Sequence, residues 1–196
     1  MKRIVSPINQ REDRLPPGQR WISSPIVYDI VDHIPQWDID KYRFKVFGLV
    51  ENPLEFRYEE LLKMPSVELI ADFHCVTRWS VKDILWEGIQ TSSLLSLAKP
   101  KGEARYVMVH SLDGYTTNMP LEYLLYEDSL LAYKMNGQTI PLRHGYPLRL
   151  IVPRLYAWKS AKYVWGIELL AKDAPGYWEQ RGYNMRGDPW KEERYW

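Results

Sequence analysis

The only cysteine in the chain stands in the stretch ADFHCVTRWSV, where His74 precedes Cys75 and Arg78 follows it by three residues. A buried cysteine is usually an inert apolar residue, whereas a thiolate is a nucleophile and a ligand for soft metals. The apolar residues before Cys75 predict a strand that ends at the cysteine, and Arg78 is a cation that would favour the thiolate. These neighbours favour a nucleophile or a metal ligand.

Three chemical uses of Cys75 can be compared. A nucleophile needs a histidine base, and since His74 would point to the opposite face of the strand, His110 or His144 would have to serve. A structural zinc site lacks partners, because one cysteine and four scattered histidines have no finger-like spacing. A metal whose other donors come from a cofactor needs only one cysteine. The residue count fits this third use best.

A second group of polar residues lies between positions 135 and 167. His144, Arg149, Lys159 and Lys162 occur there among turns and two apolar runs, so several donors could converge on one anion. The alternative is a set of ordinary surface charges at strand edges. Because the chain has no GxGxxG and no Gly-rich phosphate loop, a nucleotide is not the obvious anion.

The elements that would position these residues are mostly strands. Apolar runs and alternation predict strands within residues 42–56, 66–73, 105–112, 129–142, 147–153 and 161–172, and short helices at 57–65 and 91–98. Thr91 is the expected N-cap of the second helix, and Asn136-Gly137 is a hairpin signal. The pattern indicates an α+β domain built on mixed sheets with short helices.

Length and composition limit the remaining possibilities. With 196 residues the chain is expected to form one domain at 21–196, preceded by a polar, proline-containing arm at 1–20 that has no fold of its own. The 26 Lys+Arg against 25 Asp+Glu leave no excess charge for nucleic acid. One cysteine makes no intramolecular disulfide, and no apolar run suits a signal peptide or a membrane span, so a cytoplasmic location is expected.

Several motifs, in order, resemble one known family. FHCVTRWS, WEG at 86–88, DGY at 113–115, LLAYKMNGQTIPLRHGYPLRLIVP and KSAKYVWGIEL are similar to the molybdopterin domain of the sulfite oxidase superfamily. RLPPGQ and FGLVENPLEF upstream resemble its short bacterial branch, and the likeness covers residues 15–190. It implies mixed sheets with short helices around a molybdenum–molybdopterin cofactor, and Cys75 as the protein ligand to molybdenum.

The resemblance also implies roles for residues at matching positions. Those expected to bind the cofactor are His144, Arg149, Lys159, Ser160, Ala161, Lys162, Trp21 and Tyr28, while Cys75, Tyr115 and Arg78 are expected at the reaction site. The spacing of Arg78 differs from that of the oxyanion-binding arginine in animal and plant sulfite oxidases. Arg78 could therefore face the substrate or pair with Asp83 at the surface. The arginine-asparagine-histidine motif of those enzymes is replaced by WISSPIVYDIVDHIP, with Trp21 and Tyr28 in its place.

The expected function is that of a molybdenum-dependent oxidoreductase that transfers an oxygen atom to or from a small sulfur or nitrogen compound. Electrons would pass through a separate partner, such as a haem protein, a flavoprotein or a quinone-linked protein. Two alternatives are a sulfite dehydrogenase and a cofactor-binding subunit without turnover of its own. Three or more arginines at the pocket mouth would favour an oxyanion, whereas an aromatic mouth would favour a neutral sulfoxide or N-oxide.

Overall fold

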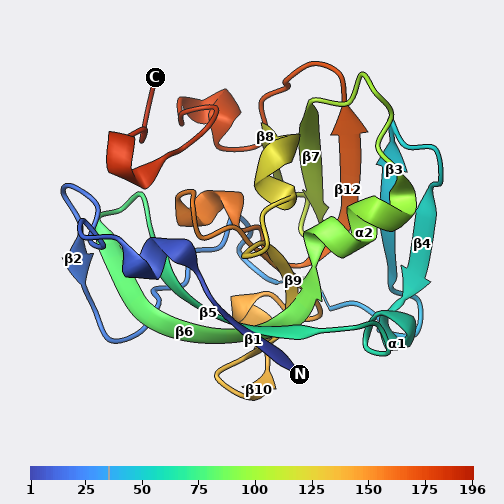
Figure 1. Ribbon diagram of the computed structural model, residues 1–196, viewed down its shortest axis with the longest axis horizontal. Helices are drawn as coiled ribbons and strands as arrows, with labels where there is room; N and C mark the ends of the chain where they lie inside the picture. Colours follow the sequence, from blue (N-terminus) through green and yellow to red (C-terminus); the bar gives the residue numbers. More distant parts are fainter. Residues whose placement is uncertain (35) are drawn as a thin grey trace.

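Two β-sheets of mixed pairing form the framework of the chain (Figure 1). The computed structural model describes residues 1–34 and 36–196. Strands β1 (Lys2–Val5) and β5 (Val67–His74) pair in parallel, as do β3 (Arg43–Gly48) and β12 (Val164–Leu170), and Arg20–Trp21 pairs in parallel with Trp79–Ser80. The other neighbouring strands in the described residues are antiparallel. The predicted α+β class with mixed sheets is therefore confirmed.

The larger sheet contains seven strands in the described part of the chain. Its main path runs β1, β5, β6 (Trp79–Gln90), β9 (Leu130–Met135) and β10 (Gln138–Thr139), while β2 (Arg20–Trp21) pairs with β6 and β11 (Arg149–Ile151) pairs with β9. Asn136 and Gly137 join β9 to β10 with positive φ at both residues. The predicted hairpin is confirmed, because this is the backbone that such a two-residue turn requires.

Strand β6 was not predicted, although its 12 residues make it the longest strand described. Its register with β9 shifts between Glu87 and Gly88, and its partner β5 has a shift between Ala71 and Phe73. These bulges break the alternation that marks a strand in sequence. At the bulge between β6 and β9, a Cβ on Gly88 would lie 2.2 Å from the Leu131 carbonyl oxygen. The backbones of β6 and β9 are therefore too close for any residue other than glycine at position 88.

The smaller sheet has the strand order β4, β3, β12, β7, β8. Here β4 is Leu54–Arg57, β7 is Tyr106–Ser111 and β8 is Thr116–Pro120. Strands β3 and β4 are antiparallel across the Asn52-Pro53 turn, which confirms the strand, turn, strand prediction for residues 42–56.

The helices are short. Within residues 1–34 and 36–196 the α-helices are α1 (Tyr58–Leu61) and α2 (Thr91–Ala98). Turns of 3-10 helix occur at η1 (Pro7–Gln10), η2 (Leu121–Leu124), η3 (Leu142–His144), η4 (Ala157–Lys159), η5 (Glu179–Arg181) and η6 (Pro189–Lys191). Gln90, rather than the predicted Thr91, is the N-cap of α2, because the Thr91 hydroxyl donates to the Leu124 carbonyl at 2.6 Å. None of the helices in the described residues is long and apolar enough to cross a membrane.

Residues 1–20 have more regular structure than the sequence predicted. Lys2–Val5 form the edge strand β1, in which Ile4 is buried against β5. Farther along, Arg14 donates two hydrogen bonds to the fully buried carboxylate of Asp72 in β5. The segment therefore lies against the domain through backbone pairing and an ion pair, two interactions that its polar composition does not reveal.

Two apolar clusters fill the interior. One lies between the smaller sheet, α2 and the larger sheet, with Phe44, Leu94, Val107 and Leu131 among its fully buried residues. The other covers strands β5 and β6, and several of its members, including Cys75, also line the main cavity. The candidate functional residues are thus attached to a packed core.

Candidate active site

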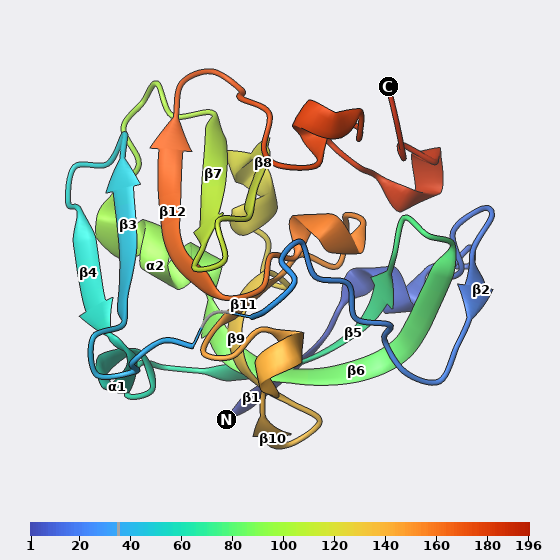
Figure 2. The same ribbon diagram turned by 180° about the vertical axis from the view of Figure 1, so that it is seen from behind.

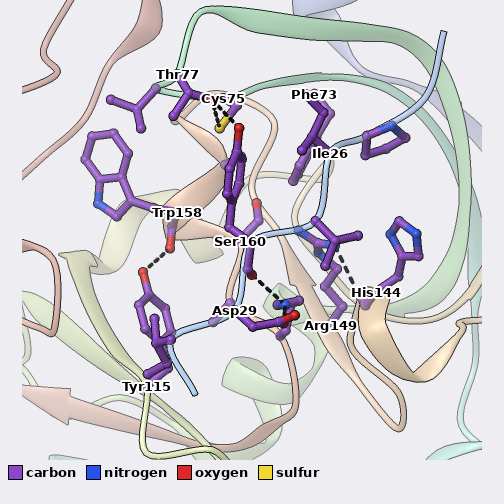
Figure 3. Close-up of a pocket in the computed structure, with 18 of the residues that line it drawn as sticks. Ile26, Asp29, Phe73, Cys75, Thr77, Tyr115, His144, Arg149, Trp158 and Ser160 are labelled. Carbon is purple, nitrogen blue, oxygen red and sulfur yellow. Dashed lines mark hydrogen bonds and ion pairs between the residues drawn. The ribbon is translucent and has the colours of Figure 1, made fainter. Parts of the chain in front are cut away.

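A cavity of about 290 Å³ opens where several distant chain segments meet (Figure 3). Residues 25–30, the end of β5 with the turn after it, the Asp113–Tyr115 turn, the η3–β11 segment and residues 157–162 all contribute to its lining. Figure 2 shows the chain after β2 crossing the molecule near β11. Walls supplied by segments far apart in sequence are typical of a ligand site.

Cys75 lies in the tight turn between β5 and β6. Its N–H donates to the Trp79 carbonyl at 2.9 Å, and the Arg78 N–H donates back to the Cys75 carbonyl at 3.1 Å. The side chain is 6% exposed and lines the cavity, so burial raises the pKa of its thiol. The Thr77 hydroxyl, 3.2 Å from Cys75 Sγ, acts in the opposite direction. A metal would displace the thiol proton, as it does at any cysteine ligand.

Aromatic side chains surround the Cys75 end of the cavity. Phe73, Trp79, Trp158, Trp178 and Tyr183 all belong to the lining. The ring of Tyr183 stacks on Trp178 with centroids 5.0 Å apart and meets Trp158 edge-on at 5.0 Å. These walls are rigid and largely apolar, which suits a neutral substrate with an apolar part.

Arg149 lies deep in the cavity wall, on β11. It is 8% exposed, and burial lowers the pKa of its guanidinium to about 10. Its Nη1 donates to the His144 carbonyl at 2.9 Å, and its guanidinium carbon lies 4.9 Å from the centre of the Phe73 ring. Among the described residues it has no carboxylate partner, and its Nε has no hydrogen-bond acceptor. A buried cation without a counterion is costly unless a bound anion completes the site.

His144 and Lys162 lie beside Arg149 because Gly145 permits a close approach. Gly145 has a φ of 122°, and a Cβ there would lie 3.1 Å from Arg149 Cβ and 3.3 Å from Lys162 Cα. Lys162 Nζ donates to the Asp29 carboxylate, which also accepts from Arg143 at 3.2 Å. Burial and the neighbouring cations hold the pKa of His144 below its usual value. This end of the cavity is cationic, with Asp29 as its built-in anion.

The other predicted cavity residues are Tyr28, Tyr115, Ser160 and Ala161, and all four line it. The Tyr115 hydroxyl donates to the Trp158 carbonyl at 2.6 Å, so it holds the aromatic wall in place. Ser160 Oγ accepts from the Val152 N–H at 3.0 Å. The structure therefore brings together Cys75, Tyr115, His144, Arg149, Lys162, Tyr28, Ser160 and Ala161.

Lys159 lies behind this wall instead of in it. Its side chain is fully buried, and its Nζ donates to the Glu179 carboxylate, to the Asn118 carbonyl at 2.7 Å and to the Met185 carbonyl at 2.7 Å. Burial lowers the pKa of Lys159, and Glu179 opposes this shift. Every donor of the ammonium is used by protein groups, so the geometry does not support the predicted contact with a cofactor.

Arg78 and Trp21 also lie outside the cavity lining. Arg78 is exposed, and its guanidinium lies against the backbone of Gly18. A Cβ added to Gly18 would lie only 2.8 Å from Arg78 Nη1. The alternative partner Asp83 pairs with Arg14 at 2.6 Å. The Lys82 ammonium nitrogen lies over the Trp21 ring, 4.8 Å from its centre. The structure thus supports neither the substrate role nor the surface pair expected of Arg78, nor a cofactor role for Trp21.

The histidines considered as bases for Cys75 lie in different parts of the molecule. His110 Nε2 lies 2.9 Å from Glu168 on the smaller sheet, and it does not line the cavity. His74 Nδ1 lies 2.8 Å from Ser80 Oγ, and burial lowers the pKa of its imidazole to about 4. Only His144 shares the cavity with Cys75, at the cationic end.

The cavity fits a large anionic cofactor that brings its own donors to a metal. No cluster of three metal-ligating side chains occurs in the part of the chain that the structure describes, so Cys75 would need donors from another group. Three buried nitrogens in the lining, Trp79 Nε1, His144 Nδ1 and Arg149 Nε, have no hydrogen-bond partner among the described residues. Unpaired buried polar atoms around an aromatic cavity are what a polar ring system with a phosphate would satisfy.

Sequence reasoning missed several lining residues. Asp29 stands next to Tyr28, Thr77 lies two residues after Cys75, and Trp158 precedes the lysine of the KSAK stretch. Adjacency to residues already selected was the only available signal, because the direction of these side chains depends on turns. The tail residues Trp178 and Tyr183 lie in the motifs GYW and RGY, which also resemble the short bacterial branch, but sequence reasoning gave them no role.

Comparisons with known proteins agree with this geometry. Residues 31–178 match the family model described as "Oxidoreductase molybdopterin binding domain". The chain is 41% identical to the uncharacterized oxidoreductase YuiH of Bacillus subtilis, over 95% of this chain and 94% of that protein. It is 30% identical to the protein-methionine-sulfoxide reductase catalytic subunit MsrP of Ralstonia nicotianae, over 74% of this chain and 49% of that protein.

A solved structure shows the same architecture. The sulfane dehydrogenase SoxCD of Paracoccus pantotrophus aligns with a TM-score of 0.64 at 25% identity, covering 71% of this chain and 40% of that one. The chain thus spans nearly all of YuiH but about half of MsrP and less than half of the SoxCD chain. Taken with the cavity, these matches establish that the chain belongs to the oxidoreductase molybdopterin-binding domain family and is an oxidoreductase of the sulfite oxidase type.

Proposed function

We propose that the protein holds molybdenum through Cys75 and reduces a small, neutral sulfoxide by oxygen-atom transfer. The observation that carries this proposal is the polarity of the cavity, which has a buried thiol among aromatic rings at one end and an unpaired buried guanidinium at the other. In Figure 3, Cys75, Thr77 and Trp158 lie on one side, and Asp29, His144 and Arg149 lie on the other. One end suits a soft metal, and the other suits an anionic group.

Different residues of the chain would bind different parts of the cofactor. The bound group would supply a two-electron metal centre with an exchangeable oxygen position. Cys75 would give it one soft sulfur ligand from the protein, in a turn fixed by two backbone hydrogen bonds. Arg149, Lys162 and the unpaired His144 Nδ1 would bind its anionic and polar parts. Trp158 and Tyr183 would exclude water around the reacting atoms.

The aromatic surroundings of Cys75 support a neutral sulfoxide over an oxyanion. Among the cations of the lining, Arg143 and Lys162 gather around Asp29, and Arg149 lies over the Phe73 ring, where its charge acts on the Cys75 thiol. Arg78 does not line the cavity. A relative is named for the reduction of protein methionine sulfoxide. In such a reaction a sulfoxide takes up two protons and two electrons, and its oxygen leaves as water while a thioether remains.

Electrons would come from a separate partner, as expected from the sequence. MsrP is named as a catalytic subunit, which supports an arrangement in which another protein supplies the reducing equivalents. A haem protein, a flavoprotein or a quinone-linked protein could each serve. The cytoplasmic location expected from the sequence stays a prediction.

Metal analysis tests the ligand assignment. Protein produced in a host that makes the cofactor is expected to contain about one molybdenum per chain, with a sulfur-to-metal charge-transfer absorption that Cys75→Ser removes or shifts. The same centre in wild type and Cys75→Ser would overturn the assignment of Cys75.

Activity assays test the substrate class. Reduced viologen should be oxidised in the presence of methionine sulfoxide or an aryl methyl sulfoxide, whereas sulfite with an artificial electron acceptor should give little turnover. Preferred oxidation of sulfite would favour the sulfite dehydrogenase alternative, and preferred reduction of an N-oxide would favour a nitrogen substrate. Full metal loading without turnover of any of these compounds would favour a cofactor-binding subunit.

A further inference from the structure

Three polar groups form a chain that ends on the Cys75 sulfur. The Thr77 hydroxyl donates to Cys75 Sγ at 3.2 Å, and Tyr28 Oη lies 3.2 Å from Thr77 Oγ1. Thr77 has a single hydroxyl hydrogen, which it gives to the sulfur, so Tyr28 must be the donor in the second bond. The order of donation is therefore Tyr28 to Thr77 to Cys75. Figure 3 shows Thr77 beside Cys75.

The position of Thr77 follows from the turn that holds Cys75. The turn is closed by bonds between the Cys75 and Trp79 backbones and between the Arg78 and Cys75 backbones. Arg78 has a φ of 74°, so the chain reverses sharply and Thr77 remains beside the sulfur. The turn thus holds the Thr77 hydroxyl beside the sulfur.

Tyr28 comes from a different part of the chain. It belongs to residues 25–30, which cross the cavity, and the next residue, Asp29, pairs with Lys162 and Arg143. The Tyr28 ring is 53% exposed, so its hydroxyl connects the buried sulfur to the surface. Two anchors, Tyr28 on Thr77 and Asp29 on the cations, hold this segment at opposite ends of the cavity.

We propose that Thr77 is a positioning residue that sets the electron-donor strength of the Cys75 sulfur toward molybdenum, and that Tyr28 holds its hydroxyl in the donating orientation. This inference rests on the proposed role of Cys75 as a ligand. A hydrogen bond to a ligating sulfur withdraws electron density from it, which favours the reduced metal and raises the reduction potential. Thr77 itself makes no contact with a reacting atom.

The test compares Thr77→Val, which keeps the shape and removes the hydroxyl, with Thr77→Ser, which keeps the hydroxyl. Thr77→Val is expected to bind wild-type amounts of molybdenum, with a lower midpoint potential, a shifted sulfur-to-metal absorption and a kcat about tenfold lower. Thr77→Ser should restore the potential and the absorption. Thr139→Val, at an exposed threonine of β10, is the matched control and should change neither.

Tyr28→Phe provides an independent measurement, because it leaves the Cys75 turn intact. Its potential and absorption are expected to move in the same direction as those of Thr77→Val, by less. If Thr77→Val does not fold or load, an unchanged potential in Tyr28→Phe overturns the proposal. Wild-type potential and absorption in a loaded Thr77→Val, or an equal shift in Thr77→Ser, would overturn it too.

These readouts separate this inference from the proposed function. The potential and the absorption need no substrate, so failure of every sulfoxide to react would contradict the substrate class and leave the Thr77 test valid. Retention of the wild-type centre in Cys75→Ser would contradict the ligand assignment itself. If Cys75 proves to be the ligand but the potential and the absorption do not change when the Thr77 hydroxyl is removed, only the inference about Thr77 is contradicted.

Discussion

Lys159 and Arg149 are both buried cations in the segment that the sequence selected as anion-binding, yet their surroundings differ completely. The Lys159 ammonium meets the Glu179 carboxylate and two backbone carbonyls behind the cavity wall. The Arg149 guanidinium lies in the wall itself, with one carbonyl, an aromatic ring and no carboxylate among the described residues.

The difference shows how to separate structural charges from binding charges. A protein that buries a cation for its own stability also supplies the counterion, because an unpaired buried charge costs several kcal/mol. Where the counterion is missing beside a cavity, the completed site includes something the chain does not provide. By this criterion we expect Lys159 to be structural and Arg149 to bind a ligand.

The largest expected effect comes from removing the carboxylate of the buried pair. Glu179→Gln keeps the size of the side chain and an oxygen that can accept from Trp158 Nε1, which lies 2.8 Å from Glu179 Oε1. It removes the carboxylate that contacts the Lys159 ammonium, and we expect a loss of about 3 kcal/mol in the free energy of unfolding. Urea denaturation followed by tryptophan fluorescence measures this loss.

A half-exposed carboxylate is the control for this substitution. The Glu168 side chain is 31% exposed and pairs with His110. Glu168→Gln should therefore lower the free energy of unfolding by less than about 1 kcal/mol. Similar losses for Glu179→Gln and Glu168→Gln would mean that the buried pair contributes no more than a surface contact, and the distinction between Lys159 and Arg149 would fail.

The second prediction concerns Arg149. Arg149→Met should leave the stability of the cofactor-free protein unchanged or higher, because it removes a buried charge that has no partner. The same variant should lose cofactor about ten- to a hundredfold more readily, since charge-assisted bonds to a buried anion contribute about 1.5 to 3 kcal/mol each. Molybdenum content after dialysis and urea denaturation give the two quantities.

Arg105→Met, at an exposed arginine outside the cavity lining, should change neither quantity. Full cofactor retention in Arg149→Met would show that the missing counterion does not mark a binding site.

The fold could be predicted where local patterns and turn chemistry coincide. Strands β3 and β4 around Asn52-Pro53, and the hairpin at Asn136-Gly137, follow from alternation interrupted by a turn signal. The long strand β6 was missed because its bulge at Gly88 breaks the period of two. The edge strand β1 was missed because its pairing with β5 is a contact between distant residues, which a local pattern does not encode.

The site could be predicted as far as residue type and motif position allow. Cys75, Arg149 and Lys162 line the cavity, and the sequence selected them because the motifs that carry them have a characteristic order. Lys159 was misplaced because it lies one residue before Ser160 in the same motif, and only the 3-10 turn η4 sends its side chain away from the cavity. Asp29 gave no signal beyond its position next to Tyr28, since its partners Lys162 and Arg143 are more than a hundred residues away.

The third prediction uses Lys162, which is intermediate between the two cations. Its ammonium lines the cavity as Arg149 does, yet it is already paired with Asp29. Lys162→Met should therefore weaken cofactor retention less than Arg149→Met does. Asp29→Asn should retain cofactor roughly threefold better than wild type, because it removes a carboxylate that competes for the same cations. Weaker retention in Asp29→Asn would instead assign that carboxylate to the bound state.

The smallest effect is the acid dependence of the Asp29 contacts. Burial opposes ionisation of Asp29, but the hydrogen bond and charge of Lys162, together with Arg143, outweigh it and hold the pKa of the carboxyl below its ordinary value. A carboxyl with a lowered pKa in the folded state stabilises the fold above its ordinary pKa of about 4, and this contribution disappears as the pH falls through the lower, folded value. Wild type should therefore exceed Asp29→Asn in unfolding free energy by about 1 kcal/mol at pH 6, and the difference should shrink as the pH falls below about 4.

Asp113 provides a comparison of opposite sign for this last prediction. Burial raises the pKa of its carboxyl, so its ionisation lowers stability as the pH rises above about 4. Asp113→Asn keeps an oxygen that can accept from the Tyr115 N–H, which now bonds the carboxylate at 3.1 Å. Relative to wild type, Asp113→Asn should thus gain stability as the pH rises above about 4, whereas Asp29→Asn should lose stability as the pH rises toward about 4. Equal slopes in the two variants would mean that the cations at this end of the cavity do not distinguish a paired carboxylate from an unpaired one.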